Sequence, residues 1–175
     1  DYLYFIYPAV GIFLVVLISK WIVREKVGHG IPIMLYAISK GNGNIGKKDT
    51  WASVISAAIT VGFGGSVGLE GPTVATSGAL SSNIGQLLRL DYKKNKLLIG
   101  AAASGALAAI FNAPIAAIIF ALEVIMLDLT ITSLIPLLLS SATAAVMSRL
   151  LFSNDYLFHF NVIDTFNVKD IFFYV

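Results

Sequence analysis

One carboxylate stands by itself in a long apolar stretch of this chain. Glu70 is the only Asp, Glu, Lys or Arg between residues 50 and 88, and it lies in the segment Gly68-Leu69-Glu70-Gly71-Pro72. An unpaired carboxylate in an apolar medium is costly. Proline is favoured in the first turn of a helix, so Pro72 predicts a helix N-terminus next to the carboxylate. The free amide N–H groups of such an N-terminus stabilise negative charge.

The same geometry suits a small inorganic anion, because unpaired N–H donors and a partial positive charge meet at a helix N-terminus. An anion displaces a carboxylate that is seated there, and a proton releases it, so either event makes Glu70 a gate. The structural alternative is that Glu70 caps the helix or pairs with a basic residue. The nearest basic residues in the sequence are Lys48 and Arg89, which leaves that alternative without a local partner.

The segment Gly28-His29-Gly30-Ile31-Pro32 repeats the pattern. Its glycines permit tight turns, and the apolar stretch that follows to Ile38 is too short to cross about 30 Å of hydrocarbon. We therefore expect a helix that dips into the membrane, with its N-terminus opposed to the one at Glu70. Broken helices of this kind hold anions near the midplane of transporters. His29 either donates an N–H to the anion or serves as a structural donor in the loop.

The composition is that of a membrane protein. Of 175 residues, 57% are hydrophobic and 13% are charged, whereas about 25% are charged in an ordinary soluble domain. A net charge of +2 spread over short loops makes no basic face, which excludes a nucleic-acid partner. The chain has no cysteine and two distant histidines, so we expect no metal site and no cofactor.

The apolar runs predict an all-α protein. We expect helices at residues 2–19, 32–38, 50–88, 97–110, 115–126 and 132–147. The run 50–88 is too long for one helix, and its glycines divide it into two helices that meet at an irregular turn. The segment Phe111-Asn112-Ala113-Pro114 predicts a further turn and helix start, with Asn112 or Ala113 near the N-cap.

Small residues at 75–79 and 101–106 predict close helix packing, because lipid supplies no hydrophobic drive. Basic clusters at residues 20–26, 40–48 and 89–96 predict the cytoplasmic side.

These segments resemble the CLC family of chloride channels and proton-coupled chloride transporters. Residues 28–32 are similar to the family's GSGIP element, and residues 68–72 to its GREGP element, with the gating glutamate at Glu70. The run from Gly100 through Phe111-Asn112-Ala113-Pro114 to Glu123 resembles the segment that follows in the family. The elements occur in family order, and the resemblance covers about residues 5–150.

The resemblance implies an integral membrane protein that forms the N-terminal part of the CLC inverted-repeat fold, with broken and re-entrant helices. We expect a fragment of the N-terminal half, with an incomplete pore domain at residues 1–150 and a connection towards the second half at 151–175. It further implies chloride or another small anion as substrate, the lipid bilayer of the cell membrane as surroundings, and a homodimer in which each subunit has its own pore. No enzyme activity is expected.

By the same resemblance, the anion-binding residues are His29, Gly30, Ile31 and Gly71. His29 stands where the family usually has serine, which leaves the choice between chloride and another anion open. The backbone N–H groups of Gly30 and Ile31 remain available for coordination.

The transport mode depends on a pair of residues after the third helix start. Antiporter members carry two successive acids there, the second being the internal proton acceptor, but this chain has Glu123-Val124. The apolar Val124 resembles channel members and predicts passive, gated conduction. The alternative is a proton-coupled antiporter in which Glu123 or Asp128 takes the proton. A more remote alternative is an intramembrane enzyme, for which the apolar segments hold no nucleophile motif. A purely structural subunit leaves Glu70 without a purpose.

Overall fold

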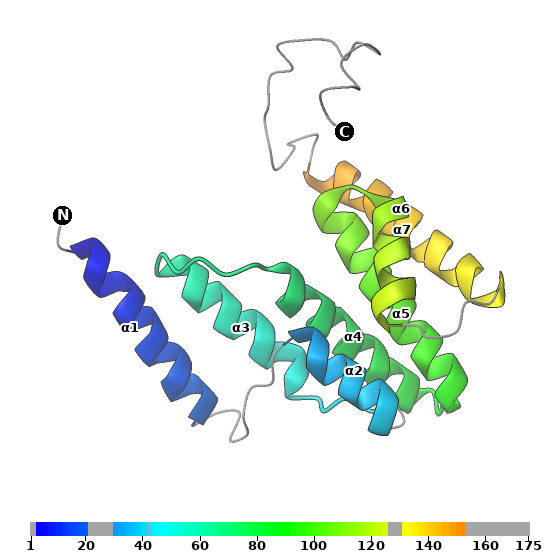
Figure 1. Cartoon of the computed structure of the whole chain (residues 1–175), viewed down its shortest axis with the longest axis horizontal. Coiled ribbons are helices and arrows are strands. Elements are labelled where there is room, and N and C mark those ends of the chain that lie inside the picture. The colour runs from blue at the N-terminus through cyan, green and yellow to red at the C-terminus, as the bar shows by residue number, and fades with distance from the viewer. Residues whose placement is uncertain (1–2, 21–29, 42, 126–130, 153–175) are drawn as a thin grey trace, which may run out of the picture.

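The computed structural model describes residues 3–20, 30–41, 43–125 and 131–152. Over these ranges the chain is helical and has no β-strand (Figure 1), so the prediction of an all-α protein is confirmed. The helices are, in chain order, α1 (Leu3–Ile18), α2 (Gly30–Lys40), α3 (Asp49–Gly62), α4 (Glu70–Leu87), α5 (Tyr92–Phe111), α6 (Pro114–Phe120), the π-helical η2 (Ala121–Ile125) that continues α6, and α7 (Ile131–Phe152).

The irregular turn predicted inside the run 50–88 lies between α3 and α4. The amide of Gly64 donates to Val61 O at 2.9 Å and the amide of Gly65 donates to Thr60 O at 2.8 Å, which closes the end of α3. Gly64 has a φ of +84°, a conformation that favours glycine. The sequence therefore breaks the helix where its glycines gather, and α4 begins at Glu70.

Two helix boundaries differ from the expected ones. The helix expected from residue 97 begins at Tyr92, and the helix expected to end at 147 continues to Phe152. Asp91 is the extended N-cap residue of α5, and its carbonyl accepts from the amide of Asn95 at 2.9 Å. Lysine is a good helix former, so the lysines of the basic cluster lie in the first turns of α5, whereas Arg89 precedes the helix. Residues 153–175, most of the predicted connection, lie outside the described residues.

The helices differ in whether they are long and apolar enough to cross a membrane. Among the described residues, α7 is the helix that is both long and apolar enough to cross a membrane. Shorter apolar runs occur at Ile6–Ile18, Thr50–Gly62 and Pro114–Ile125. Helix α2 has 11 residues and rises only about 16 Å. Figure 1 shows it starting at mid-height in the molecule, beside α4, which agrees with a helix that dips in without spanning.

Helix α5 is the centre of the bundle, and it packs against α4, α6 and α7. A Cβ at Gly105 would lie 2.5 Å from Ser140 Oγ of α7, so the missing side chain lets the two helices approach. Ser140 Oγ donates to Ala101 O at 2.6 Å, and Ser148 Oγ donates to Ala109 O at 2.9 Å. The small residues of α5 therefore serve helix packing, as predicted.

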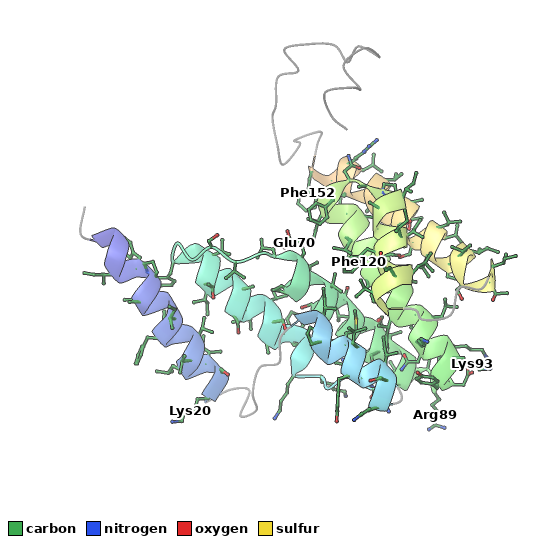
Figure 2. The ribbon with its side chains drawn as sticks, in the orientation of Figure 1. Lys20, Glu70, Arg89, Lys93, Phe120 and Phe152 are labelled. Atoms are coloured by element: carbon green, nitrogen blue, oxygen red, sulfur yellow. The ribbon has the colours of Figure 1, made fainter. Side chains whose placement is uncertain are left out.

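The described basic side chains at the helix ends are exposed, and the view in Figure 2 places three of them at one edge of the molecule. Lys20 at the end of α1, Arg89 after α4 and Lys93 at the start of α5 all lie there, away from Phe152 at the end of α7. Their common edge accords with the predicted cytoplasmic side, which remains a prediction. Residues 21–26 of the first cluster lie outside the described residues.

Buried hydrogen bonds tie the loop between α2 and α3 to α4 and α5. Ser82 Oγ on α4 donates to Gly43 O at 2.6 Å and accepts from the amide of Ile45 at 3.0 Å. Asn95 Nδ2 on α5 donates to Gly43 O at 3.0 Å. Ser82 is fully buried and Asn95 nearly so. These bonds fix the end of α2 and the start of α3 against the bundle.

We predict that Ser82→Ala lowers the free energy of unfolding by about 1–3 kcal/mol, because it leaves the buried amide of Ile45 without an acceptor. Unfolding in mixed detergent micelles measures this difference. The control is Ser77→Ala on the same helix, whose hydroxyl donates within α4 to Val74 O at 3.0 Å. Equal stability of the two variants would contradict the proposed anchor.

Candidate anion site

The N-termini of α2 and α4 meet through their backbones. Gly30, the first residue of α2, has a φ of +40°. A Cβ built on it would lie 3.2 Å from both the carbonyl carbon and the oxygen of Gly71, and 3.3 Å from its Cα. Only glycine permits this conformation and this approach without strain. The structure therefore brings the two predicted glycine-proline segments together at Gly30 and Gly71, while Gly28 and His29 lie outside the described residues.

An open groove of about 420 Å³ runs between these N-termini and one face of α3. Its lining consists of Gly30, Ile31, Pro32, Ser53, Ser56, Ala57, Thr60, Val67, Gly71 and Pro72. A Cβ at Gly71 would meet no atom within 4 Å, so packing does not exclude a side chain there. The space in front of the Gly71 backbone is open to a ligand.

The backbone at the start of α4 offers unpaired donors to its surroundings. The first intrahelical hydrogen bond of α4 joins the amide of Thr73 to Leu69 O at 3.0 Å. Pro72 has no N–H, so the amides of Glu70 and Gly71 precede that bond as free donors. The partial positive charge of the helix N-terminus is centred on them. No described residue that lines the two hollows near this helix start is basic, so the backbone itself favours negative charge there.

Glu70 is the first residue of α4, and its side chain is exposed. A Cβ at Gly68 would collide with Oε2 of Glu70, so the carboxylate lies back over a glycine that leaves room for it. The N-cap residue Leu69 makes no side-chain cap. Within the described part of the chain, the structure gives the Glu70 carboxylate neither an ion pair nor a hydrogen bond. The structural alternative of a paired or capping glutamate is not realised there.

A second hollow of about 270 Å³ is lined in part by Glu70, and it shares Ile31 with the groove. Besides Glu70, its lining is apolar: Ile31, Leu107, Phe111, Ala113, Ala116, Ala117 and Phe120. Glu70 and Phe120 can be followed in Figure 2, at the start of α4 and the end of α6. The starts of α2, α4 and α6 all contribute to this hollow. We call it the apolar pocket.

The turn before α6 resolves a choice that the sequence left open. Asn112 takes a left-handed φ of 52° at the end of α5, and Ala113 is the N-cap residue of α6. Pro114 follows in the first turn, as predicted. Arg149 Nε on α7 donates to Asn112 Oδ1 at 2.7 Å, which holds the turn against the end of α7.

The two residues expected to decide the transport mode lie in η2. Val124 is partly buried and packs against the hydrophobic core, whereas Glu123 is exposed. Neither lines the groove or the apolar pocket. Asp128, the other acid considered for proton transfer, lies outside the described residues.

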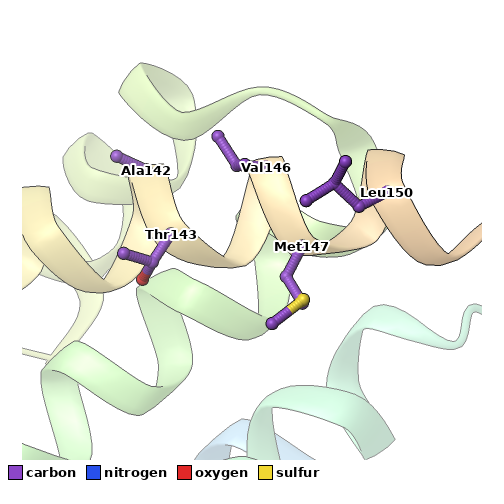
Figure 3. A pocket seen from close by; sticks show the side chains of 5 residues that line it. All are labelled: Ala142, Thr143, Val146, Met147 and Leu150. Carbon is purple, nitrogen blue, oxygen red and sulfur yellow. The ribbon is translucent and has the colours of Figure 1, made fainter.

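A third hollow, on α7, is lined by no charged side chain. Figure 3 shows its lining along two turns of the helix: Ala142, Thr143, Val146, Met147 and Leu150. The Thr143 hydroxyl is engaged with Leu139 O at 2.6 Å. Among the described residues, no group of three His, Cys, Asp or Glu side chains is placed to hold a metal ion.

The sequence predictions missed two groups of residues that line the site. One is the polar face of α3, and its signal is the recurrence of Ser53, Ser56 and Thr60 at helical spacing in an apolar run. The other is the aromatic pair Phe111 and Phe120 in the apolar pocket, which nothing in the sequence distinguishes from ordinary core residues.

Comparison with known proteins decides the family. Residues 11–175 match the model of the voltage gated chloride channel family. The chain belongs to this family. It is 31% identical over 137 residues to a putative chloride channel protein, ClcB-like, of Ralstonia nicotianae, covering 76% of this chain and 31% of that protein. The CLC resemblance is confirmed, and with it an integral membrane protein.

Two relatives are named as exchangers. The H(+)/Cl(-) exchange transporter ClcA of Vibrio campbellii is 38% identical over 105 residues, which is 57% of this chain and 21% of that protein. The ClcA of Vibrio cholerae is 34% identical over 98 residues, or 54% of this chain and 21% of that protein. The chain thus spans about a fifth to a third of the length of these CLC proteins.

We predict that Gly30→Ala lowers the free energy of unfolding by about 1–2 kcal/mol, because an L side chain is strained at this positive φ and presses on the backbone of Gly71. The control is Gly62→Ala at the end of α3, where a Cβ meets no atom within 4 Å. Unfolding in detergent compares the two variants. If Gly30→Ala is as stable as the control, the contact between the N-termini is not tight.

Proposed function

We propose that this chain forms part of the ion pathway of a chloride transporter. The observation that carries the proposal is the contact of Gly30 with Gly71, which places the N-termini of α2 and α4 beside one open groove. Free amide donors at a helix N-terminus bind anions without a full positive charge. This allows an anion to bind and to leave again, which transport requires.

The proposed anion-binding groups are the backbone at Gly30, Ile31 and Gly71, together with the side chain of His29. Gly30, Ile31 and Gly71 line the groove. Chloride is favoured by the names of the CLC relatives. The open space at Gly71 supports the proposal, because it leaves the backbone accessible to an ion.

Glu70 is the proposed gate. Glu70 is the first residue of α4, so its side chain is within reach of the free amides of that helix, and there its carboxylate would compete with an anion for the same donors. When protonated, the side chain is neutral and loses that attraction. The apolar pocket lies beside it and has an otherwise apolar lining, so it accommodates a neutral carboxyl group better than a charged one. Lower pH therefore opens the pathway.

Passive, gated conduction is the proposed mode. It is supported by Val124, a side chain that cannot exchange a proton and that packs against the core. The competing proposal is proton-coupled exchange, which the names of the Vibrio relatives favour. In that case Glu123 or Asp128 replaces the acid missing at Val124.

The remaining proposals concern the surroundings of the protein. We infer a homodimer in a lipid bilayer, in the cell membrane, with a pore in each subunit. The support for the bilayer is the apolar surface of helices such as α7. The protein is proposed to move ions and to catalyse no covalent chemistry.

We predict that Glu70→Gln in the whole protein, reconstituted into liposomes, gives high chloride flux that no longer rises as the pH falls. Glutamine mimics the protonated carboxyl and cannot titrate. Chloride efflux measured across neutral and acidic pH tests this. The control is Asp91→Asn, an exposed carboxylate that lies 3.6 Å from Lys94 Nζ at the start of α5. A Glu70→Gln protein that keeps the wild-type pH profile rules out the gate.

We predict that a chloride gradient across such vesicles drives no uphill proton movement, because Val124 offers no internal proton acceptor. A pH-sensitive dye inside the vesicles records the protons. Uphill proton movement that Glu70→Ala abolishes would establish exchange in place of conduction. Separate Glu123→Ala and Asp128→Ala variants would then show which acid replaces the one missing at Val124.

A further inference from the structure

The face of α3 that lines the groove is polar in an otherwise apolar helix. Ser53, Ser56 and Thr60 recur at helical spacing, and all three contribute to the lining. They stand opposite the N-termini of α2 and α4, which form the rest of the wall. The groove therefore has hydroxyl groups on one side and backbone amides on the other.

The three hydroxyl groups differ in their bonding. Thr60 Oγ1 donates to Ser56 O of its own helix at 2.8 Å, which is the usual way for a membrane helix to satisfy a hydroxyl. Ser53 is only 8% exposed, and among the described residues its hydroxyl has no hydrogen-bond partner. The Ser56 hydroxyl, on the next turn, likewise has no partner in the described part of the chain.

A hydroxyl that faces a groove and has no partner in the protein is usually satisfied by water or by a ligand in that groove. The same groove is lined by Gly30, Ile31 and Gly71 at two helix starts, where the first amides of a helix lack an intrahelical acceptor. A serine hydroxyl donates as well as accepts, so one acceptor in the groove can satisfy both the hydroxyl and these amides. A small anion accepts hydrogen bonds from every side, and it is favoured by the partial positive charge of the two helix N-termini.

We propose that the hydroxyl groups of Ser53 and Ser56 on α3 bind the transported anion, as the second wall of the site whose first wall is the backbone of α2 and α4. This rests on the proposed function and extends it. The hydroxyl wall also sets ion preference. Hydroxyl donors interact most strongly with an anion of high charge density, so they favour chloride over the larger and more diffuse iodide.

The test is equilibrium binding of chloride and of iodide to the whole protein, measured by calorimetry in detergent. A hydrogen bond from a neutral donor to a charged group predicts about tenfold weaker chloride binding in Ser53→Ala. Iodide binding should fall less, so the preference for chloride shrinks. Ser53→Thr keeps the hydroxyl and should restore both values. Ser56→Ala should act in the same direction as Ser53→Ala.

One control variant and the wild-type protein separate the possible results. Ser77→Ala removes a hydroxyl of α4 that donates to Val74 O and lines no groove, and it should change neither affinity. If the wild-type protein binds no chloride, the proposed function fails and the hydroxyl wall with it. If wild type binds chloride and Ser53→Ala leaves both affinities unchanged, the groove holds water at this wall and the inference is overturned while the proposed function stands.

Discussion

Unpaired backbone N–H groups inside an apolar medium are the constraint on which this architecture depends. A helix that starts within a membrane exposes amides that lipid cannot satisfy. The chain meets this constraint by pairing two such starts, so that both of them border one open groove. The two helix starts can share this groove because Gly30 and Gly71 approach closely, and any side chain at Gly30 would separate them. The proposed anion site lies where these helix starts meet.

The remaining helices hold this pair in place. Helix α4 packs against α2, α3 and α5, and α5 in turn packs against α6 and α7. The helices approach closely because glycine, alanine and serine line their contacts, and serine hydroxyls bond to carbonyls of the neighbouring helix. In lipid such contacts replace the hydrophobic effect as the source of helix association. The polar atoms of the bundle thus contribute to stability as well as to the site.

Much of this arrangement is predictable from the sequence, because glycine and proline mark helix starts by their backbone geometry. The segments at Gly30 and at Glu70 predict both helix starts. The expected opposition of the two N-termini is not seen, because Figure 1 shows α2 and α4 side by side and running in the same sense. The interaction of Arg149 with Asn112 is different, since it joins residues 37 apart and depends on how α7 crosses α5. The sequence prediction starts this helix at residue 97, where the apolar run begins, whereas α5 starts at Tyr92, because lysine suits a helix that emerges into water.

The polar face of α3 shows a further limit of sequence patterns. Serine and threonine in a membrane helix serve packing, backbone bonds or ligands, and spacing does not separate these uses. Thr60 bonds to its own backbone while Ser53, two turns earlier, does not. That difference depends on which neighbour faces each residue, and this is set by the tertiary fold.

Helix α1 packs against α3. At this contact Gly11 lies against the side chain of Phe63, at the end of α3. Figure 1 shows α1 at the margin of the molecule, next to α3. Residues of α3 also line the groove. Membrane thickness affects the tilt of an apolar helix. A change in the tilt of α1 would therefore act first on a helix that lines the groove, through the contact of Gly11 with Phe63.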